Sequence, residues 1–201
     1  MKKLLAALCF VLSPAAVAEV THVDVETALH SVVVKTAYPD QYRITKIGME
    51  DPIGVIWNHQ RDICEFVVSA RNIGSLALMI GFQQKMPMLE GFVAHELSHC
   101  VELATLHDEG GVLAMQRLLQ NPDNRFASEL LSDIVAIMYW KRFHPTNANK
   151  YIGTLIGWRR AAHGDDVLHA TYPSLVKALP LIPSRFDYQR AIEIRELVIP
   201  R

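Results

Sequence analysis

Hydrophobic positions divide the chain into a front part with short apolar runs and a later part with helical periodicity. Residues 53–58 and 62–69 are short runs rich in β-branched and aromatic residues, with polar residues near position 60 between them. Such runs predict two strands joined as a hairpin. Apolar spacings and terminal signals predict helices over residues 26–35, 88–104, 112–119, 121–143, 147–162, 171–179 and 185–197. The pattern predicts a mainly helical α+β fold with a small β-sheet before the helix at 88–104.

The predicted helix at 88–104 contains the pentapeptide His-Glu-Leu-Ser-His at residues 95–99. Residues four apart lie above one another on a helix, so His95 and His99 can offer two imidazole nitrogens to one metal ion. Glu96 is rotated to the side, where it can reach a water molecule activated by that metal without being a ligand. Zn²⁺ prefers such nitrogen ligands, and the spacing H-E-x-x-H therefore predicts a catalytic zinc site.

A catalytic zinc usually has a third protein ligand, and two regions offer one. His107 and Asp108 follow the motif soon after and would serve if the helix ended sharply. Glu129 and Asp133 are also four residues apart, on a later helix whose other positions are largely apolar. Buried carboxylates need partners, which a metal ion and its ligand histidine would supply. Glu129 is the favoured third ligand, with a solvated charged stripe as the alternative for this pair.

The first eighteen residues have the pattern of a Sec-type signal peptide. Lys2 and Lys3 precede a short apolar run at residues 4–12, and Ala16-Val17-Ala18 matches an A-x-A cleavage site. We expect cleavage before Glu19, no stable membrane anchor afterwards, and a periplasmic or secreted protein. The alternative is an N-terminal membrane anchor, for which the apolar run is too short.

Export changes the interpretation of the cysteines. Cys9 would leave with the signal peptide, so that Cys64 and Cys100 remain. Two cysteines in an oxidising compartment predict one disulfide, which would tie the strand at 62–69 to the motif helix. Two buried free thiols are the alternative. A third interpretation, Cys100 as a zinc ligand, is disfavoured because its place directly after His99 turns it away from the metal.

Composition limits the class of protein. The chain has 201 residues, a formal net charge of -1 and 50% hydrophobic residues. This length is consistent with a single domain over residues 19–201. Nothing in the charge pattern indicates nucleic acid as a partner.

H-E-x-x-H on one helix followed by E-x-x-S-D on a later one resembles the gluzincin metallopeptidases, the thermolysin-like clan. The resemblance covers residues 95–99 and 129–133 and implies a zincin-like domain that holds one zinc ion. It implies that His95, His99 and Glu129 are the ligands and that Glu96 is the general base. Asp133 would orient a ligand histidine, His95 being the first candidate.

The resemblance also implies an activity, the hydrolysis of peptide bonds in a peptide or protein substrate. In this clan a His or Tyr downstream of the glutamate ligand stabilises the oxyanion, for which we nominate His169 first, then His163 and Tyr172. The strand at 62–69 is the expected edge for pairing with an extended substrate. The alternatives are a non-catalytic zinc-stabilised periplasmic binding domain and a structural exported protein in which the motif is accidental.

Overall fold

Helices dominate the part of the chain that the computed structural model describes, which comprises residues 19–36, 42–47, 53–58, 60–61, 63–69, 73–74, 76, 80, 84–162 and 170–199. The predicted signal peptide lies outside the described residues. The elements are α1 His22–Thr36, β1 Tyr42–Ile47, β2 Ile53–Asn58, β3 Ile63–Ser69, α3 Lys85–Gln120, α4 Pro122–Phe143, α5 Ala148–Ala162, α6 Tyr172–Ala178, the short 3₁₀ helix η1 Leu179–Leu181, and α7 Tyr188–Val198. The predicted mainly helical α+β fold with a small sheet before the motif helix is confirmed.

The sheet has three strands in the order β1-β3-β2. β2 and β3 are antiparallel, as the predicted hairpin requires, with Val55 opposite Phe66. β1 lies parallel to β3 and was not predicted, although Arg43 and Thr45 alternate there with Tyr42 and Ile44. Six residues with partial alternation are a weak signal, and a parallel neighbour gives no turn that could mark the strand.

The predicted role of residues 62–69 as a substrate-binding edge is wrong. β3 is paired with β1 on one side and with β2 on the other, so its backbone groups are used within the sheet. β2 lies at one edge of the sheet and packs beside α3. Alternation alone cannot distinguish a central strand from an edge strand, because pairing partners are decided by the tertiary structure.

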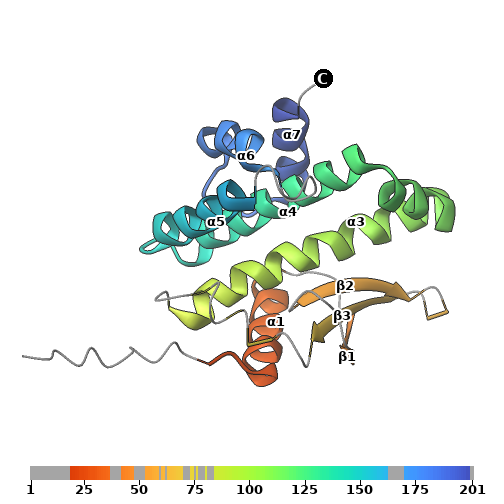
Figure 1. Cartoon of the computed structure of the whole chain (residues 1–201), viewed down its shortest axis with the longest axis horizontal. Helices are drawn as coiled ribbons and strands as arrows, with labels where there is room; N and C mark the ends of the chain where they lie inside the picture. Colours follow the sequence, from red (N-terminus) through yellow and green to blue (C-terminus); the bar gives the residue numbers. More distant parts are fainter. Residues whose placement is uncertain are drawn as a thin grey trace, which may run out of the picture.

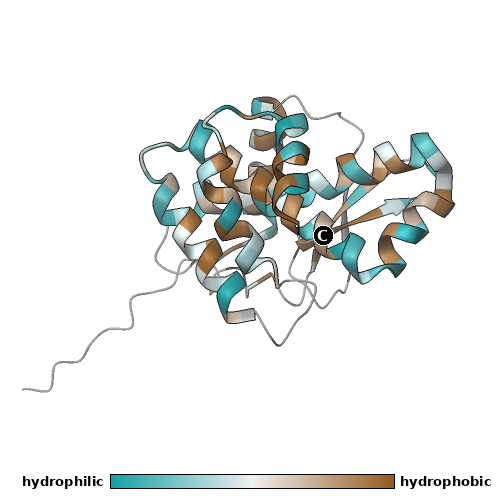
Figure 2. Cartoon of the chain, turned by 90° about the horizontal axis from the view of Figure 1, so that it is seen from above, coloured by the Kyte–Doolittle hydropathy of each residue, from teal (hydrophilic) through white to brown (hydrophobic). Residues whose placement is uncertain are grey.

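α3 lies in the middle of the molecule, between two groups of elements (Figure 1). It contacts α1, β2 and β3 on one side and α4 on the other, and α5, α6 and α7 pack around α4. Figure 2 shows hydrophobic and hydrophilic positions alternating along the helices, as expected of amphipathic helices that bury one face. The motif helix is thus buried between layers, and its histidines face α4.

A glycine lets α3 and α4 approach closely one turn before the motif. A Cβ on Gly91 would lie only 2.0 Å from Cε2 of Trp140, whose side chain is fully buried. The indole Nε1 of Trp140 donates to the carbonyl oxygen of Pro87 at 2.8 Å. Because any larger residue at position 91 would push α4 away, Gly91 helps to set the separation at which α4 meets the motif.

Local features explain where α1 and α7 begin and where α3 bends. α1 starts four residues earlier than predicted because Thr21 and Asp24 cap it reciprocally, the Asp24 carboxylate accepting from the Thr21 N–H at 2.8 Å. α7 starts three residues later than predicted, where the Asp187 carboxylate accepts from the Arg190 N–H at 3.1 Å. The predicted break before residue 112 is a kink within α3 at Gly111, whose φ is +59°.

The buried carboxylate of Glu90, on α3 before the motif, joins α1, α3 and α4. Four groups contact the Glu90 carboxylate, namely Ser31 at 2.6 Å, Lys35 at 3.0 Å, Tyr139 at 2.9 Å and His144 at 2.5 Å. Burial raises the pKa of Glu90, but hydrogen bonds from these partners outweigh burial and lower the pKa to about 2. The ionised carboxylate therefore stabilises the packing of the three helices.

We expect this cluster to make folding stability depend on acid pH. The pKa of Glu90 in the folded protein lies below its ordinary value of 4.5, so its contribution is present above pH 4.5 and is lost as the pH falls toward 2. At about 1.4 kcal/mol per pKa unit, wild type should lose about 3 kcal/mol of unfolding free energy relative to Glu90→Gln across that window. Denaturant unfolding of both proteins at several pH values measures this, and parallel pH profiles would contradict it.

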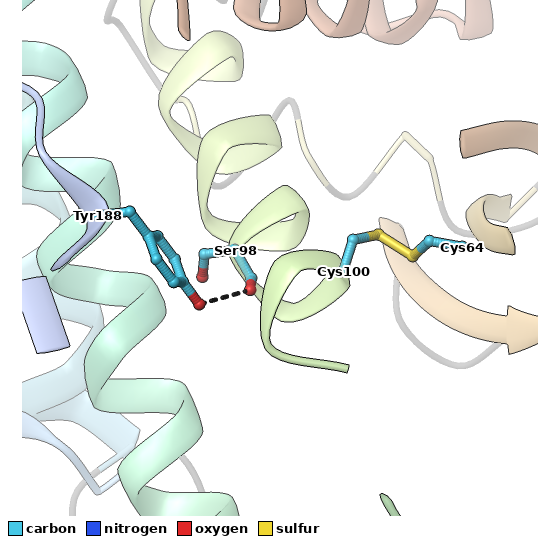
Figure 3. Close-up of a disulfide and its surroundings, with 4 residues drawn as sticks. All are labelled: Cys64, Ser98, Cys100 and Tyr188. Carbon is cyan, nitrogen blue, oxygen red and sulfur yellow. Dashed lines mark hydrogen bonds between the residues drawn. A yellow bond between two sulfur atoms is a disulfide. The ribbon is translucent and has the colours of Figure 1, made fainter. Parts of the chain in front are cut away.

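The predicted disulfide is confirmed, since Cys64 of β3 and Cys100 of α3 are bonded with a Cα–Cα distance of 5.6 Å. Figure 3 shows α3 held from two sides, by Cys64 on one and by Tyr188 of α7 on the other. The Tyr188 hydroxyl donates to the carbonyl oxygen of Ser98 at 3.2 Å. Both free-thiol and ligand interpretations of Cys100 are therefore wrong, because its sulfur is in the disulfide.

Removal of the disulfide should destabilise the protein without changing its fold. The bond closes a loop of 36 residues, for which chain-entropy arguments give about 3–4 kcal/mol. We expect the Cys64→Ser, Cys100→Ser double variant to lose about that much unfolding free energy in denaturant titrations. Wild type treated with a reducing agent should match the double variant, and equal stability of all three samples would contradict the prediction.

Candidate metal centre

The two motif histidines lie side by side on the face of α3 that meets α4. Their ring centroids are 5.1 Å apart and the rings are nearly perpendicular. This arrangement follows from the four-residue spacing of His95 and His99 on a continuous helix. Their side chains are only 12% and 15% exposed, so the rings are fixed by packing rather than moving in solvent.

Glu129 of α4 completes a cluster with these histidines. Its Oε2 lies 3.5 Å from Nε2 of His95, and its Oε1 lies 3.6 Å from Nε2 of His99. One potential ligand atom from each of the three residues lies within 4.8 Å of the others. The structure thus brings together the three residues proposed as ligands from the sequence, in an arrangement that could hold a metal ion.

The second nitrogen of each ring contacts a residue of α4. Nδ1 of His95 lies 3.2 Å from Oδ1 of Asp133, whose side chain is fully buried. Nδ1 of His99 lies 3.0 Å from the hydroxyl of Ser128. With both Nδ1 atoms engaged, both Nε2 atoms face Glu129, which is the orientation that a metal site requires.

Arg159 and Thr171, which the sequence did not identify, complete the surroundings of Asp133. Arg159 of α5 donates to both carboxylate oxygens of Asp133, at 2.8 and 2.7 Å, and to Oε2 of Glu129 at 3.1 Å. The Thr171 hydroxyl donates to Asp133 at 2.7 Å. A buried pair of carboxylates signals that a cation must be near, but the sequence alone does not select which arginine supplies it.

These contacts shift the pKa values of the cluster in opposite directions. Burial lowers the pKa of His95, but its contacts with Asp133 and Glu129 outweigh burial and raise the pKa to about 10. Burial lowers the pKa of His99 to about 4. Burial raises the pKa of Glu129, but the neighbouring histidines and Arg159 hold it well below its usual range. In the metal-free protein at neutral pH, Glu129 is therefore ionised, His99 is neutral and His95 is protonated, so that a metal ion would displace a proton from His95.

Glu96 lies next to His95 on α3 and acts on it electrostatically, its negative charge contributing to the raised pKa of that histidine. About 100° of rotation separates adjacent residues on a helix, which turns Glu96 away from the line of the two histidines. It is partly exposed. Glu96 is not part of the cluster of His95, His99 and Glu129, and its role as general base stays a prediction.

The remaining candidates from the sequence have different outcomes. His163 and His169 lie outside the described residues. Tyr172 begins α6, directly after the Thr171 that bonds Asp133, so the segment is anchored beside the cluster. His107 lies eight residues beyond His99, about 12 Å along the helix, with its ring 5.5 Å from that of Trp57. The alternative of His107 or Asp108 as third ligand is thus not supported, and neither belongs to the cluster.

No protein-family model, no curated protein and no solved structure matches this chain. Among the described residues, no helix combines the length and the apolar character needed to cross a bilayer. The interpretation of the site therefore depends on its residues and their geometry.

Proposed function

We propose that the protein is a zinc metallopeptidase of the gluzincin type, which holds one zinc ion through His95, His99 and Glu129. The observation that supports this most is the convergence of these three donors within 4.8 Å, from helices that are separate in sequence. Two imidazole nitrogens and one carboxylate oxygen are a ligand set of catalytic zinc, and three protein ligands leave a position for water.

The fit of this donor set to zinc is supported by the contacts behind each ligand. Asp133 holds His95 through Nδ1 and Ser128 holds His99 in the same way, at 3.2 and 3.0 Å. Such outer contacts fix the ring orientation and the basicity of the ligating nitrogen. These contacts are those expected behind ligand histidines, and they leave Nε2 of both rings facing Glu129.

The residues of the chain then have defined tasks. When bound, zinc supplies a Lewis acid that lowers the pKa of water toward about 7 and polarises a carbonyl group. Glu96 accepts the proton of the attacking water and delivers it to the departing amine. Tyr172, at the anchored start of α6, is the described candidate for stabilising the oxyanion, and His163 and His169 remain candidates by sequence.

Export to the periplasm or beyond the cell is part of the proposal. The predicted signal peptide motivates it, and the Cys64–Cys100 disulfide supports it because such bonds persist in oxidising compartments. The substrate would be a peptide or protein.

Metal analysis combined with peptide hydrolysis tests the proposal. We expect one zinc per chain by elemental mass spectrometry and cleavage of a mixed-sequence peptide library, detected by mass spectrometry. Chelation should remove both properties, and added zinc should restore both. Purified protein that binds no zinc, or that leaves the library intact when loaded with zinc, would overturn the assignment.

A second candidate is a non-catalytic domain that zinc stabilises. The observation that favours it is the burial of the cluster, since His95, His99 and Glu129 are only 12%, 15% and 20% exposed and a bound ion there would join α3 to α4. Chelation would then lower the melting temperature strongly although the zinc-loaded protein cleaves no peptide. That pair of results distinguishes this candidate from the peptidase.

A further inference from the structure

The two ligand histidines are held by different chains of contacts, and the chain behind His99 reaches the C-terminal helix. Nδ1 of His99 lies 3.0 Å from the Ser128 hydroxyl and 3.3 Å from the Ser132 hydroxyl. The Ser132 hydroxyl also lies 2.5 Å from that of Ser98. Ser128 is therefore the nearer partner of the ring.

On its other side, Ser128 contacts a largely buried ion pair formed by Glu102 and Arg195. The Ser128 hydroxyl donates to Oε2 of Glu102, and Nη1 of Arg195 lies 3.1 Å from Oε1 of the same carboxylate. The Glu102 and Arg195 side chains are only 13% and 16% exposed. Arg195 belongs to α7, and its other nitrogens donate to Glu196 at 2.9 and 2.7 Å, which holds the guanidinium in place.

The directions of these hydrogen bonds determine which ring nitrogen of His99 carries a proton. A serine hydroxyl has one proton, and both oxygens of the Glu102 carboxylate accept, one from Ser128 and the other from Arg195. Because Ser128 gives its proton to Glu102, its oxygen must accept from Nδ1–H of His99. Nδ1 of His99 therefore carries a proton, and Nε2, the atom that faces Glu129, is the ring nitrogen left to bind a metal ion.

We propose that Ser128, Glu102 and Arg195 are positioning residues that fix the Nδ1–H tautomer of His99 and couple α7 to metal affinity. The inference rests on the proposed metal site and adds a role for the C-terminal helix. It parallels the chain behind His95, where Asp133 contacts the ring directly and Arg159 of α5 pairs with Asp133. In each chain a carboxylate is neutralised by an arginine from a later helix.

Zinc affinity measured by competition with a chromophoric chelator tests this coupling. Ser128→Ala, Glu102→Gln and Arg195→Met should each weaken zinc binding, by about 10–100-fold for the first two, the range for groups that orient ligands. The double variant Ser128→Ala, Glu102→Gln should bind zinc about as tightly as whichever single variant binds it less tightly. The reason is that both substitutions interrupt the same series of contacts behind His99. Additive losses would show two independent structural effects and overturn the proposal.

Two controls separate the chain from general disturbance of the fold. Ser132→Ala removes the more distant hydroxyl, and Arg190→Met removes an exposed ion pair with Glu193 on the same helix as Arg195. Arg190→Met should bind zinc within about twofold of wild type. Ser132→Ala should weaken zinc binding less than Ser128→Ala does, because its hydroxyl lies farther from the His99 ring. If Ser132→Ala weakens binding as much as Ser128→Ala, the assignment to Ser128 fails. Circular dichroism identifies the variants that keep the helical fold. If Ser128→Ala does not fold, Glu102→Gln is used in its place to test the proposal.

The tautomer of His99 in the metal-free protein gives a second measurement that needs no activity. Long-range ¹H–¹⁵N spectra should place the proton of His99 on Nδ1 in wild type and shift the population toward Nε2–H in Ser128→Ala. A wild-type ring protonated on Nε2 would overturn the proposal. Wild type that binds zinc, with variants of unchanged affinity, would remove the chain but leave the proposed function. Wild type that binds no zinc would exclude the proposed function. The tautomer measurement would then still show whether Ser128 and Glu102 fix the proton of His99 on Nδ1.

Discussion

Glu96→Gln is expected to reduce peptide hydrolysis about 10³-fold while zinc remains bound, because a general base contributes about 10²–10⁴-fold. Gln has nearly the shape of Glu but cannot accept the proton of the attacking water. The proposed ligand cluster of His95, His99 and Glu129 does not include position 96, so metal content should be unchanged. Initial rates on a peptide found in the library experiment, together with zinc analysis of the same samples, measure both quantities.

Glu109→Gln is the matched control for this variant. Glu109 is an exposed glutamate of the same helix, ten residues after His99. Its substitution by Gln removes the same charge as Glu96→Gln does. Its hydrolysis rate should equal that of wild type. Undiminished hydrolysis by Glu96→Gln would reject Glu96 as the base, and loss of zinc from that variant would instead assign the residue to metal binding.

Glu129→Gln is expected to cost the largest loss of metal affinity of any variant described. Structural zinc sites bind with about 12 kcal/mol shared by four ligands, so one ligand is worth about 3 kcal/mol, or at least about 100-fold in affinity. The loss should be larger here because Glu129 provides negative charge between the two histidines, and the change would leave the positive charge of Arg159 beside the site. Titration of apoprotein with zinc against a competing chelator measures this.

The contact between Arg159 and Glu129 is the reason for that larger loss. Nη2 of Arg159 lies 3.1 Å from Oε2 of Glu129. The guanidinium still pairs with Asp133 when Glu129 is neutral, but its positive charge beside the site is then less compensated, and a divalent cation is repelled.

Asp123→Asn is the matched control for Glu129→Gln. Asp123 is an exposed acidic residue in the first turn of the same helix, and the change removes one negative charge far from the histidines. Its zinc affinity should remain within about twofold of wild type, as expected for a solvent-exposed charge. Wild-type zinc affinity in Glu129→Gln would exclude Glu129 as a ligand and would leave the site with two protein ligands from the motif.

One segment of α4 supplies every α4 contact to the two motif histidines. Residues 128 and 132 are serines that contact His99, whereas residues 129 and 133 are carboxylates that contact His95. Each pair has the four-residue spacing that places side chains in a row along a helix. Two adjacent rows on α4 therefore face the two histidines of α3, and Glu129 reaches both rings.

Much of this site could be predicted from local patterns. The spacing of His95 and His99 puts two imidazoles on one helix face whatever the rest of the fold is, and the same holds for Glu129 and Asp133. The two cysteines that remain after the predicted export signal allowed one intramolecular pairing, which the structure contains. The hairpin of β2 and β3 also followed from short runs that are close in sequence.

Long-range pairing could not be predicted in this way. The position of β3 between β1 and β2 depends on which strand approaches from a distant part of the chain, and alternation within residues 62–69 is the same for a central and an edge strand. The choice of Arg159 as the partner of Asp133, and of Arg195 as the partner of Glu102, likewise depends on helix packing.

The sequence by itself determined that most of the chain is helical, the faces on which the motif side chains lie, and the residue types suited to zinc, because these depend on spacing within one element. Only the tertiary structure decided that α4 packs along α3 at the motif, at a separation that Gly91 permits against Trp140. It also decided which buried cations balance the carboxylates. Contacts between distant segments arise from the packing of the whole core, to which no single stretch of sequence corresponds.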